Sequence, residues 1–497
     1  MKKDVPIKLL LLLVILSACS FSEKAPIYQS NIHFTLDDAN LERPVELLFY
    51  KDKYHLFYQY TKDTQMNWGH VTSNDMMNWE NVASVFPPST FNGLISGSII
   101  IDWNNTLENG TGSLLAFCID EPKKNAASDE GNKQDISILY SEDGSIWKSD
   151  KNHKVILESF PEEINDIKIF WHEDTQRWIM LILSSYSIRM YSSIDLVNWN
   201  YESLFESEGL LENGDAKHIE FFPVEVEGTH ELKWILLISV DSGSPNETSG
   251  IQYFTGDFDG HSFICEQQKT NWIDSGSDDY AGVCLSNYRE CGKPLFYLGL
   301  IYSTRFETYN ENTPEKNYFT IPRMISLVKK HSNYLFRSNP VNLPGDGKKI
   351  IKAAPLSREL ILKNEITTPQ EIDLSFDVSS KLYFEFPESF GIQLSGINDS
   401  DKLTIGYYSR EHYFFISEQV KGKDTDNMSF SKYIIDQPSV DIKIIIDYPV
   451  VEMFAMDGTN VLTQRLNSSE SWDKKKLYTE GGSIKFEGGS LRSLTKK

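Results

Sequence analysis

Short runs of apolar and β-branched residues, separated by polar turns, make up most of this chain. Typical runs are residues 54–60 (YHLFYQY), 98–102 (SIIID) and 234–240 (WILLISV). Clusters of Asn, Asp, Gly and Ser lie between such runs, and these residues favour turns. Apolar residues at the spacing of an amphipathic helix are nearly absent. The pattern predicts an all-β protein.

One pattern recurs along the first part of the chain: a strand, a polar turn and an aromatic residue that opens the next strand. It occurs at residues 69–79, 139–147 and 191–199, with a looser copy at 253–263. A period of roughly 50 to 70 residues built from strands is typical of β-propeller blades of about four strands each. The closing aromatics are Trp79, Trp147, Trp199 and Phe263, and we expect the three tryptophans in the core.

The character of the chain changes near residue 345. Residues 345–349 (GDGKK) form a turn-rich junction, and apolar and polar residues alternate beyond it, as in residues 443–454. Such alternation over about 150 residues is typical of a two-sheet sandwich. We therefore predict a β-propeller over residues 28–344 and a β-sandwich over residues 345–497.

The N-terminus is typical of an export signal. A basic start precedes an apolar run over residues 9–16 and the small residues before Cys19. The run is shorter than the roughly 20 apolar residues of a membrane-spanning helix. The segment resembles a bacterial lipobox, which implies a signal peptide over residues 1–18, a lipid on Cys19 and a linker over residues 19–27.

These features predict an exported lipoprotein. It would be anchored to a membrane, with the outer membrane as the expected location, and would lie in the periplasm or at the cell surface. A plain signal peptide, or a cysteine that stands at this place by chance, are the alternatives for Cys19.

The composition fits a folded protein that handles neutral ligands. Of the 497 residues, 40% are hydrophobic and 24% are charged, as in ordinary globular proteins. Lys and Arg number 48 against 71 Asp and Glu, so the net charge is −23. A surface this acidic repels phosphate backbones, which excludes nucleic acid as a partner. A 12% share of aromatic residues favours strands and surfaces that bind carbohydrate.

The remaining cysteines and histidines indicate neither a metal nor a cofactor. The ten histidines show no metal-ligand spacing, and the chain has no paired C-x-x-C motif and no glycine-rich phosphate loop. Four cysteines allow three disulfide pairings, between which the sequence does not choose, and buried free thiols are the other possibility. They are Cys118, Cys265, Cys284 and Cys291.

A set of short motifs runs in one order along the chain. They are residues 33–35 (HFT), 54–59 (YHLFYQ), 68–70 (WGH), 96–98 (SGS), 102–106 (DWNNT), 166–173 (DIKIFWHE), 256–260 (GDFDG), 280–281 (YA), 321–323 (IPR) and 451–454 (VEMF). Taken together, the motifs resemble glycoside hydrolase family 32, the invertases, levanases and inulinases. The resemblance covers nearly the whole chain after the signal and implies a five-bladed β-propeller followed by a β-sandwich.

The resemblance also implies where a catalytic pair would stand. Family members cleave fructosyl bonds with retention, which needs a nucleophile and an acid/base, two carboxyl groups about 5–5.5 Å apart. Counted without gaps from His33, the nucleophile position of the family's WMNDPNG motif holds Arg43. Counted back from Pro223, the acid/base position of its ECPDLFP motif holds Lys217. The third acid, which in the family holds sugar hydroxyls and stabilises the transition state, is present as Asp166.

Three glutamates lie near the missing carboxylates: Glu42, Glu46 and Glu220. Each stands at an odd offset, and side chains alternate faces along a strand, so we expect them to point away from the channel. A bulge or an alignment gap would re-aim them, and a gapped alignment makes Glu220 the fallback acid. None of them supplies a nucleophile, and a guanidinium cannot attack an anomeric carbon. We therefore expect no catalytic residues.

The binding face matches the family better than the catalytic positions do. By family position, the fructose pocket would be lined by Gln59, Trp68, Ser96 and Asp166, with Ile95 where an aromatic is usual. Trp68 offers a flat apolar face to a sugar ring, and Gln59 and Asp166 can fix hydroxyl groups.

Each of these residues also has a structural interpretation. Trp68 can be a core aromatic and Gln59 a buried, hydrogen-bonded amide. Asp166 can form a buried ion pair with Arg43 and Lys217, in which case the old pocket is plugged and a glycan would bind elsewhere, on exposed aromatics.

Three hypotheses about function follow. The first is an inactive, lipid-anchored protein that binds levan- or inulin-type fructan for a partner enzyme or an outer-membrane glycan uptake complex. The second is a retaining β-fructosidase that uses displaced carboxylates. The third is a structural or assembly protein without a sugar ligand.

Overall fold

The structure is a computed structural model. It describes residues 31–83, 94–120, 134–158, 161, 163–184, 187–206, 214–267, 269–303, 316–331, 333–363, 368–379, 386–396, 401–423, 426–468 and 472–495. The expected signal peptide, Cys19 and the linker lie outside the described residues, as does the side chain of Ile95. The expected domain boundaries stay predictions.

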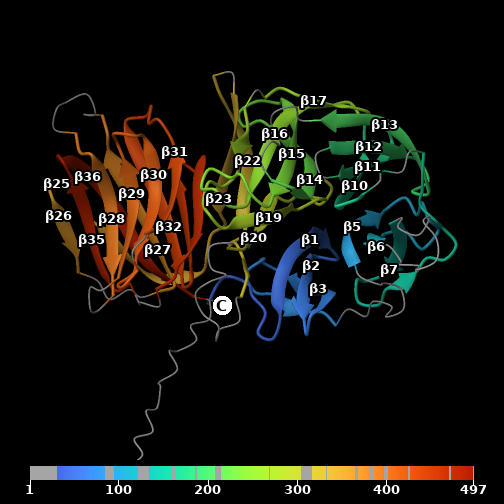
Figure 1. The fold of residues 1–497 in the computed structure, drawn as a ribbon, viewed down its shortest axis with the longest axis horizontal. Coiled ribbons are helices and arrows are strands. Elements are labelled where there is room, and N and C mark those ends of the chain that lie inside the picture. The colour runs from blue at the N-terminus through green and yellow to red at the C-terminus, as the bar shows by residue number, and fades with distance from the viewer. Residues whose placement is uncertain are drawn as a thin grey trace, which may run out of the picture.

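Five β-sheets form the first part of the chain (Figure 1). Blade 1 consists of β1 (Asn40–Tyr50), β2 (Lys53–Lys62), β3 (Gln65–Ser73) and β4 (Glu80–Asn81). Blade 2 consists of β5 (Leu94–Asp102), β6 (Ser113–Asp120), β7 (Asp135–Ser141) and β8 (Lys148–Ser149). Blade 3 has the order β10-β11-β12-β13-β9, with β9 (Ile156–Leu157), β10 (Asp166–His172), β11 (Arg177–Ser184), β12 (Ser187–Ser193) and β13 (Asn198–Glu206).

The last two blades each carry one short extra strand. Blade 4 consists of β14 (Ala216–Glu225), β15 (Leu232–Val240), β16 (Gly250–Phe258), β17 (Phe263–Cys265) and β18 (Asn271–Trp272), which pairs with β16. Blade 5 consists of β19 (Asp279–Cys284), β20 (Phe296–Ile301), β21 (Tyr318–Phe319), β22 (Arg323–Lys330) and β23 (Asn333–Pro340), with β21 on β20.

The innermost strands close a ring around a central channel. They are β1, β5, β10, β14 and β19, and each contacts the next, with β19 returning to β1. Because all five run the same way, their first residues meet at one end of the channel, which we call the Asp166 mouth. Their last residues meet at the other end, beside the turn that follows β5, which we call the Trp103 mouth.

A repeated turn explains the recurring sequence pattern. In blade 1 the carboxylate of Asp75 accepts hydrogen bonds from the backbone N–H groups two and three residues later, at 2.9 and 2.8 Å. In blade 3 Asp195 accepts the same pair, at 2.9 and 2.7 Å. The aromatics that follow pack inward: Trp147 and Trp199 are buried and Trp79 is half-buried against the blade 1 core. Their expected place in the core is confirmed.

Two further sheets form a sandwich beside blade 5 (Figure 1). The seven-stranded sheet consists of β24 (Gly345–Ile351), β25 (Ala354–Leu356), β27 (Gln370–Asp377), β32 (Ser439–Asp447), β33 (Val450–Ala455), β34 (Asn460–Arg465) and β36 (Ile484–Leu494). The six-stranded sheet consists of β26 (Glu359–Leu362), β28 (Ser389–Ser395), β29 (Lys402–Tyr408), β30 (Tyr413–Gln419), β31 (Asn427–Lys432) and β35 (Lys474–Glu480). One large apolar cluster fills the space between them. The predicted all-β class, a five-bladed propeller followed by a sandwich, is confirmed.

Two observations bear on the remaining expectations. No disulfide joins any two of the described cysteines Cys118, Cys265, Cys284 and Cys291, so none of the three pairings is formed here. Within the described ranges, no helix has the length and apolarity needed to cross a membrane.

A buried ionic network joins the propeller to the sandwich. Glu452 on β33 accepts hydrogen bonds from Arg323 Nε and Nη2, at 3.0 and 2.6 Å, and its other oxygen lies 2.9 Å from His33 Nε2. His33 Nδ1 lies 2.9 Å from Asp447. All four side chains are almost completely buried. The start of the described chain is therefore fixed to the sandwich by charges that water does not screen.

His33 makes this junction dependent on pH. Burial alone would lower the pKa of His33, but the carboxylates of Asp447 and Glu452 raise it to about 9 from its usual 6.5. A raised pKa in the folded state adds stability that is complete below pH 6.5 and is lost as the pH rises through 9. We expect the free energy of unfolding, measured with urea, to fall by about 3 kcal/mol more in the wild type than in His33→Gln between pH 6 and pH 9.5. Equal pH dependence in the two proteins would contradict this.

Candidate functional site

The two positions expected to hold the catalytic pair carry positive side chains at the Asp166 mouth. Arg43 is half-buried; its Nε donates to Gln59 Oε1 at 2.8 Å and its Nη1 to the carbonyl oxygen of Lys217 at 3.0 Å. The Lys217 side chain turns outward, with Nζ 3.3 Å from Asp215 and 3.9 Å from Asp241. The guanidinium thus bridges blades 1 and 4, where the family resemblance places a nucleophile.

The buried carboxylate of Asp166 is surrounded by polar partners. Its carboxylate accepts a hydrogen bond from the Ser96 hydroxyl and one of 3.0 Å from the Ile219 N–H, and it lies 2.6 Å from His218 Nδ1. Burial would raise the pKa of Asp166, but His218, Arg43 and Ser96 together hold it below its usual value. Of the two cations expected to pair with Asp166, Arg43 acts on its charge, whereas Lys217 pairs with Asp215 and Asp241 instead. His218, which was not expected there, contacts the Asp166 carboxylate.

The other residues expected to bind sugar are also buried. Gln59, Trp68, Ser96 and Asp166 are between 1% and 6% exposed. The Trp68 ring belongs to the apolar cluster between blades 1 and 2. It packs so closely on Gly97 that a Cβ there would lie 3.0 Å from its Cη2 and 2.3 Å from a backbone oxygen. The four residues therefore lie together beneath the mouth, and their side chains support its wall instead of forming an exposed surface.

A second charged layer fills the channel below Asp166. Lys168 follows Asp166 by two residues on β10, and its Nζ donates to Glu46 at 2.7 Å and to Glu220 at 2.9 Å. We call these three residues the channel triad. Glu46 also contacts the Ser98 hydroxyl at 3.3 Å, so β1, β5, β10 and β14 are joined across the channel. None of the triad side chains is more than 4% exposed.

The triad departs from the expected strand alternation. Glu46 and Glu220 were expected to point away from the channel, and both point into it. Register shifts between Leu41 and Arg43, and between Pro44 and Glu46, re-aim β1, and another beside Lys217 re-aims β14. Each bulge inserts one residue and reverses the alternation beyond it.

Two groups of the channel triad, Glu220 and Lys168, have pKa values shifted from their usual ones. Burial raises the pKa of Glu220 to about 7, with Glu46 adding to the rise and Lys168 opposing it. The same two carboxylates hold the pKa of Lys168 above its usual value in spite of its burial. The ammonium therefore stays charged at neutral pH and separates the two carboxyl groups.

The geometry limits the chemistry available at the Asp166 mouth. A retaining glycosidase needs two carboxyl groups, one on each side of the scissile bond. One is a carboxylate that acts as nucleophile, and the other is a carboxylic acid that donates a proton. Glu46 and Glu220 lie close to each other, but Lys168 stands between them and almost no solvent reaches them. Among the described residues, no group of three His, Cys, Asp or Glu side chains is placed to hold a metal ion.

Two residues of this region were missed from the sequence. His218 follows Lys217 directly, and only the bulge beside Lys217 turns it toward Asp166. Lys168 has the same parity on β10 as Asp166, so strand alternation alone would have placed it in the channel.

The channel triad predicts a sharp stability effect. In Lys168→Met, two carboxyl groups stay buried without their cation, which costs about 3–5 kcal/mol of unfolding free energy in urea titrations. The matched variant Lys217→Met removes an exposed partner and should change stability by less than about 1 kcal/mol. The triple variant Glu46→Leu, Lys168→Met, Glu220→Leu should regain most of the loss, because no buried charge is left over. Equal stability of the two single variants would contradict the triad as described.

Two sequence profiles of one family match most of this chain. Residues 33–338 match the sequence profile of the glycosyl hydrolases family 32 N-terminal domain, and residues 346–493 match that of the family 32 C terminal. The chain is 29% identical over 492 residues to a levanase of Bacillus subtilis, which covers 94% of this chain and 71% of the relative.

Other relatives agree with this. Invertase 2 of Saccharomyces cerevisiae is 32% identical over 489 residues, covering 87% of this chain and 88% of the relative. A fructofuranosidase from Schwanniomyces occidentalis, solved in complex with fructose, has a similar fold, with a TM-score of 0.82, 24% identity and coverage of 94% of this chain and 98% of that one. The two matched profiles together span nearly all of the described propeller and sandwich, and on that ground this chain belongs to glycoside hydrolase family 32.

Proposed function

We propose that this chain binds levan- or inulin-type fructan at the Asp166 mouth and does not hydrolyse it. The observation that carries the proposal is the pair Arg43 and Lys217 at the two positions where the family mechanism needs carboxyl groups. A guanidinium has no nucleophilic lone pair to form a glycosyl intermediate, and an alkylammonium group is a poor general acid at neutral pH. Loss of covalent and acid/base catalysis together removes several powers of ten in rate.

Support for binding comes from the polar groups that reach the mouth. Arg43, Lys217 and Tyr280 are half-buried, and Asp241 is exposed beside them. Arg43, Asp241 and Asp166 all act on the pKa of Tyr280, which burial raises, so the four groups share one small volume. Donors and acceptors arranged around a rigid frame suit a ligand rich in hydroxyl groups. The names of the relatives, levanase and invertase, make a fructosyl unit the first ligand to test.

A β-fructosidase with displaced carboxylates is the second candidate. It is favoured by the activities named for the relatives and by one observation in the channel, the pKa of Glu220 near 7. A carboxyl group with such a pKa is suited to donate a proton at neutral pH. Against this candidate stand the burial of Glu220, its bond to Lys168 and the lack of a nucleophile at position 43.

Binding without cleavage is directly measurable. Calorimetric titration with levan, inulin and fructo-oligosaccharides should give saturable heat with at least one of them. The double variant Arg43→Ala, Lys217→Ala should bind about tenfold more weakly or worse, because each lost charged hydrogen bond is worth about 1.5 kcal/mol or more. Lys53→Ala, which breaks the exposed pair with Glu80, is the matched control and should bind as the wild type does. Overnight incubation with levan should release no reducing sugar.

Two results would contradict the proposal. Absence of heat with every fructan would remove the binding role and favour a structural or assembly protein. Sugar release that disappears in Glu220→Gln would instead establish the displaced-carboxylate hydrolase.

We further propose that Cys19 carries a lipid and that the protein acts at a membrane surface, for a partner enzyme or an outer-membrane glycan uptake complex. The support is the lipobox-like segment that ends at Cys19. A polymer captured at such a surface stays close to the machinery that consumes it, because anchoring raises its effective concentration.

The anchor predicts a simple fractionation result. In the source cell, the wild type should sediment with membranes and incorporate an alkyne-labelled fatty acid. Cys19→Ala should lose the label, since its side chain has no thiol to acylate. Cys265→Ala, which removes a half-buried free thiol of the propeller, should keep the label. Labelling that persists in Cys19→Ala would exclude this residue as the lipid site.

A further inference from the structure

The Trp103 mouth opens into a cavity of about 680 Å³ that all five blades line. Leu48 comes from β1, Ile101 from β5, Trp171 from β10 and Pro223 from β14, and the loop after β19 contributes Tyr288. This volume lies within the usual range of ligand sites. Two residues of the channel triad, Lys168 and Glu220, contribute to its floor. The cavity therefore lies on the opposite side of the triad from Asp166.

Trp103 forms an exposed aromatic wall at the rim of this cavity. It is 51% exposed, although it is one of the largest apolar side chains in the protein. Its ring is nevertheless held in place: a Cβ on Gly112 would lie 3.2 Å from Cζ3, and the Tyr50 ring lies 6.4 Å away. Gly112 also has a φ of +76°, which a side chain would disfavour. A large aromatic that is both exposed and fixed is typical of a binding surface.

A second tryptophan lines the same cavity. Trp171 is half-buried, its ring lies 5.2 Å from that of Trp178 in an edge-to-face arrangement, and its Nε1 donates to Glu173 at 2.8 Å. The hydrogen bond fixes the plane of the indole, and it also holds the Glu173 carboxylate beside the ring. Aromatic faces next to oriented polar groups match the alternating C–H and O–H surfaces of a sugar.

The charges around the cavity favour a neutral ligand. The rim carries the carboxylates Glu173, Asp174 and Glu290 against the guanidinium of Arg289, and the floor adds one ammonium and the Glu220 carboxyl group. Carboxylates outnumber cations, so uronates and sulfated glycans are repelled. Hydroxyl groups, by contrast, can donate to the carboxylates and accept from Arg289.

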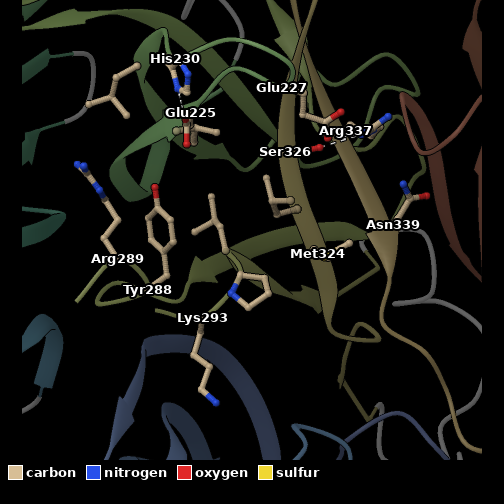
Figure 2. Close-up of a pocket in the computed structure, with 15 residues that line it drawn as sticks. Glu225, Glu227, His230, Tyr288, Arg289, Lys293, Met324, Ser326, Arg337 and Asn339 are labelled. Carbon is tan, nitrogen blue, oxygen red and sulfur yellow. Dashed lines mark hydrogen bonds and ion pairs between the residues drawn. The ribbon is translucent and has the colours of Figure 1, made fainter. Parts of the chain in front are cut away.

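The cavity continues into a neighbouring one of about 580 Å³, which lies along blades 4 and 5. The two share Leu232, Tyr288 and Arg289. Figure 2 shows Tyr288 and Arg289 side by side at one edge of the second cavity, with Lys293 nearby and Met324 and Asn339 toward its far end. This arrangement has room for several linked sugar units.

We infer that the Trp103 mouth is a second saccharide-binding site, for a neutral oligosaccharide that stacks on Trp103 and Trp171 and extends past Tyr288. The site deepens the proposed function by adding a contact for the same class of ligand on the opposite face of the propeller. A polymer chain that engages both faces of anchored proteins gains avidity without a stronger single contact.

The test is calorimetry of the full mature chain with neutral fructo-, gluco-, galacto- and manno-tetrasaccharides and with tri-galacturonate. Trp103→Ala should bind at least one neutral tetrasaccharide about tenfold more weakly than the wild type, from the loss of ring stacking. Trp103→Phe should retain binding within about threefold, because an aromatic face remains. The matched control, Tyr201→Ala, removes another exposed aromatic on β13 and should leave affinity unchanged. Tri-galacturonate should bind the wild type more than tenfold more weakly than that neutral ligand.

The outcomes separate this inference from the proposed function. If Trp103→Ala weakens binding and the double variant Arg43→Ala, Lys217→Ala does not, the result supports a binding site at the Trp103 mouth and contradicts one at the Asp166 mouth. The reverse result overturns the inference and leaves the proposed function standing. The inference is also overturned if no neutral tetrasaccharide binds, or if Trp103→Ala binds all of them as the wild type does.

Discussion

The Lys168 ammonium, held between two buried glutamates, is the interaction on which this propeller depends. Five innermost strands bring polar side chains to one axis, and the triad side chains are too deeply buried there for water to solvate their charges. The Lys168 ammonium offsets this cost of burial, because it donates a charged hydrogen bond of less than 3 Å to each carboxyl group, Glu46 and Glu220. Through Ser98 the contact reaches a fourth blade.

This layer divides the channel into two chemically different ends. On one side lie Asp166, its histidine partner and the cationic side chains of Arg43 and Lys217. On the other side lie apolar and aromatic walls with an acidic rim. Asp166 and Lys168 are only two residues apart on one strand, so one short segment, β10, sets the character of both ends. A substitution in the triad would therefore alter the charge and packing at both mouths.

Much of this could be predicted from the sequence, and the failures have identifiable causes. The repeated strand–turn–aromatic units gave the blades, because Asp75 and Asp195 build the same local turn wherever the pattern recurs. Arg43 and Lys217 were found by counting along motifs, which needs no knowledge of side-chain direction. The orientation of Glu46 and Glu220 was wrong because bulges in β1 and β14 cannot be read from residue types. The Trp103 mouth was missed because its lining comes from hairpins of five blades that are distant in sequence.

The cationic substitutions also have a thermodynamic logic. A retaining fructosidase gathers three acidic groups around one sugar, and like charges at short range in a poorly solvated site oppose folding. Here Arg43 and His218 hold the pKa of Asp166 below its usual value, so the site is stabilised by its own charges. Arg43 also donates hydrogen bonds to Gln59 and to a backbone carbonyl of blade 4, which joins blades 1 and 4 across the mouth. For the binding role proposed above, this arrangement avoids a cluster of like charges and keeps the family's frame in place around the mouth.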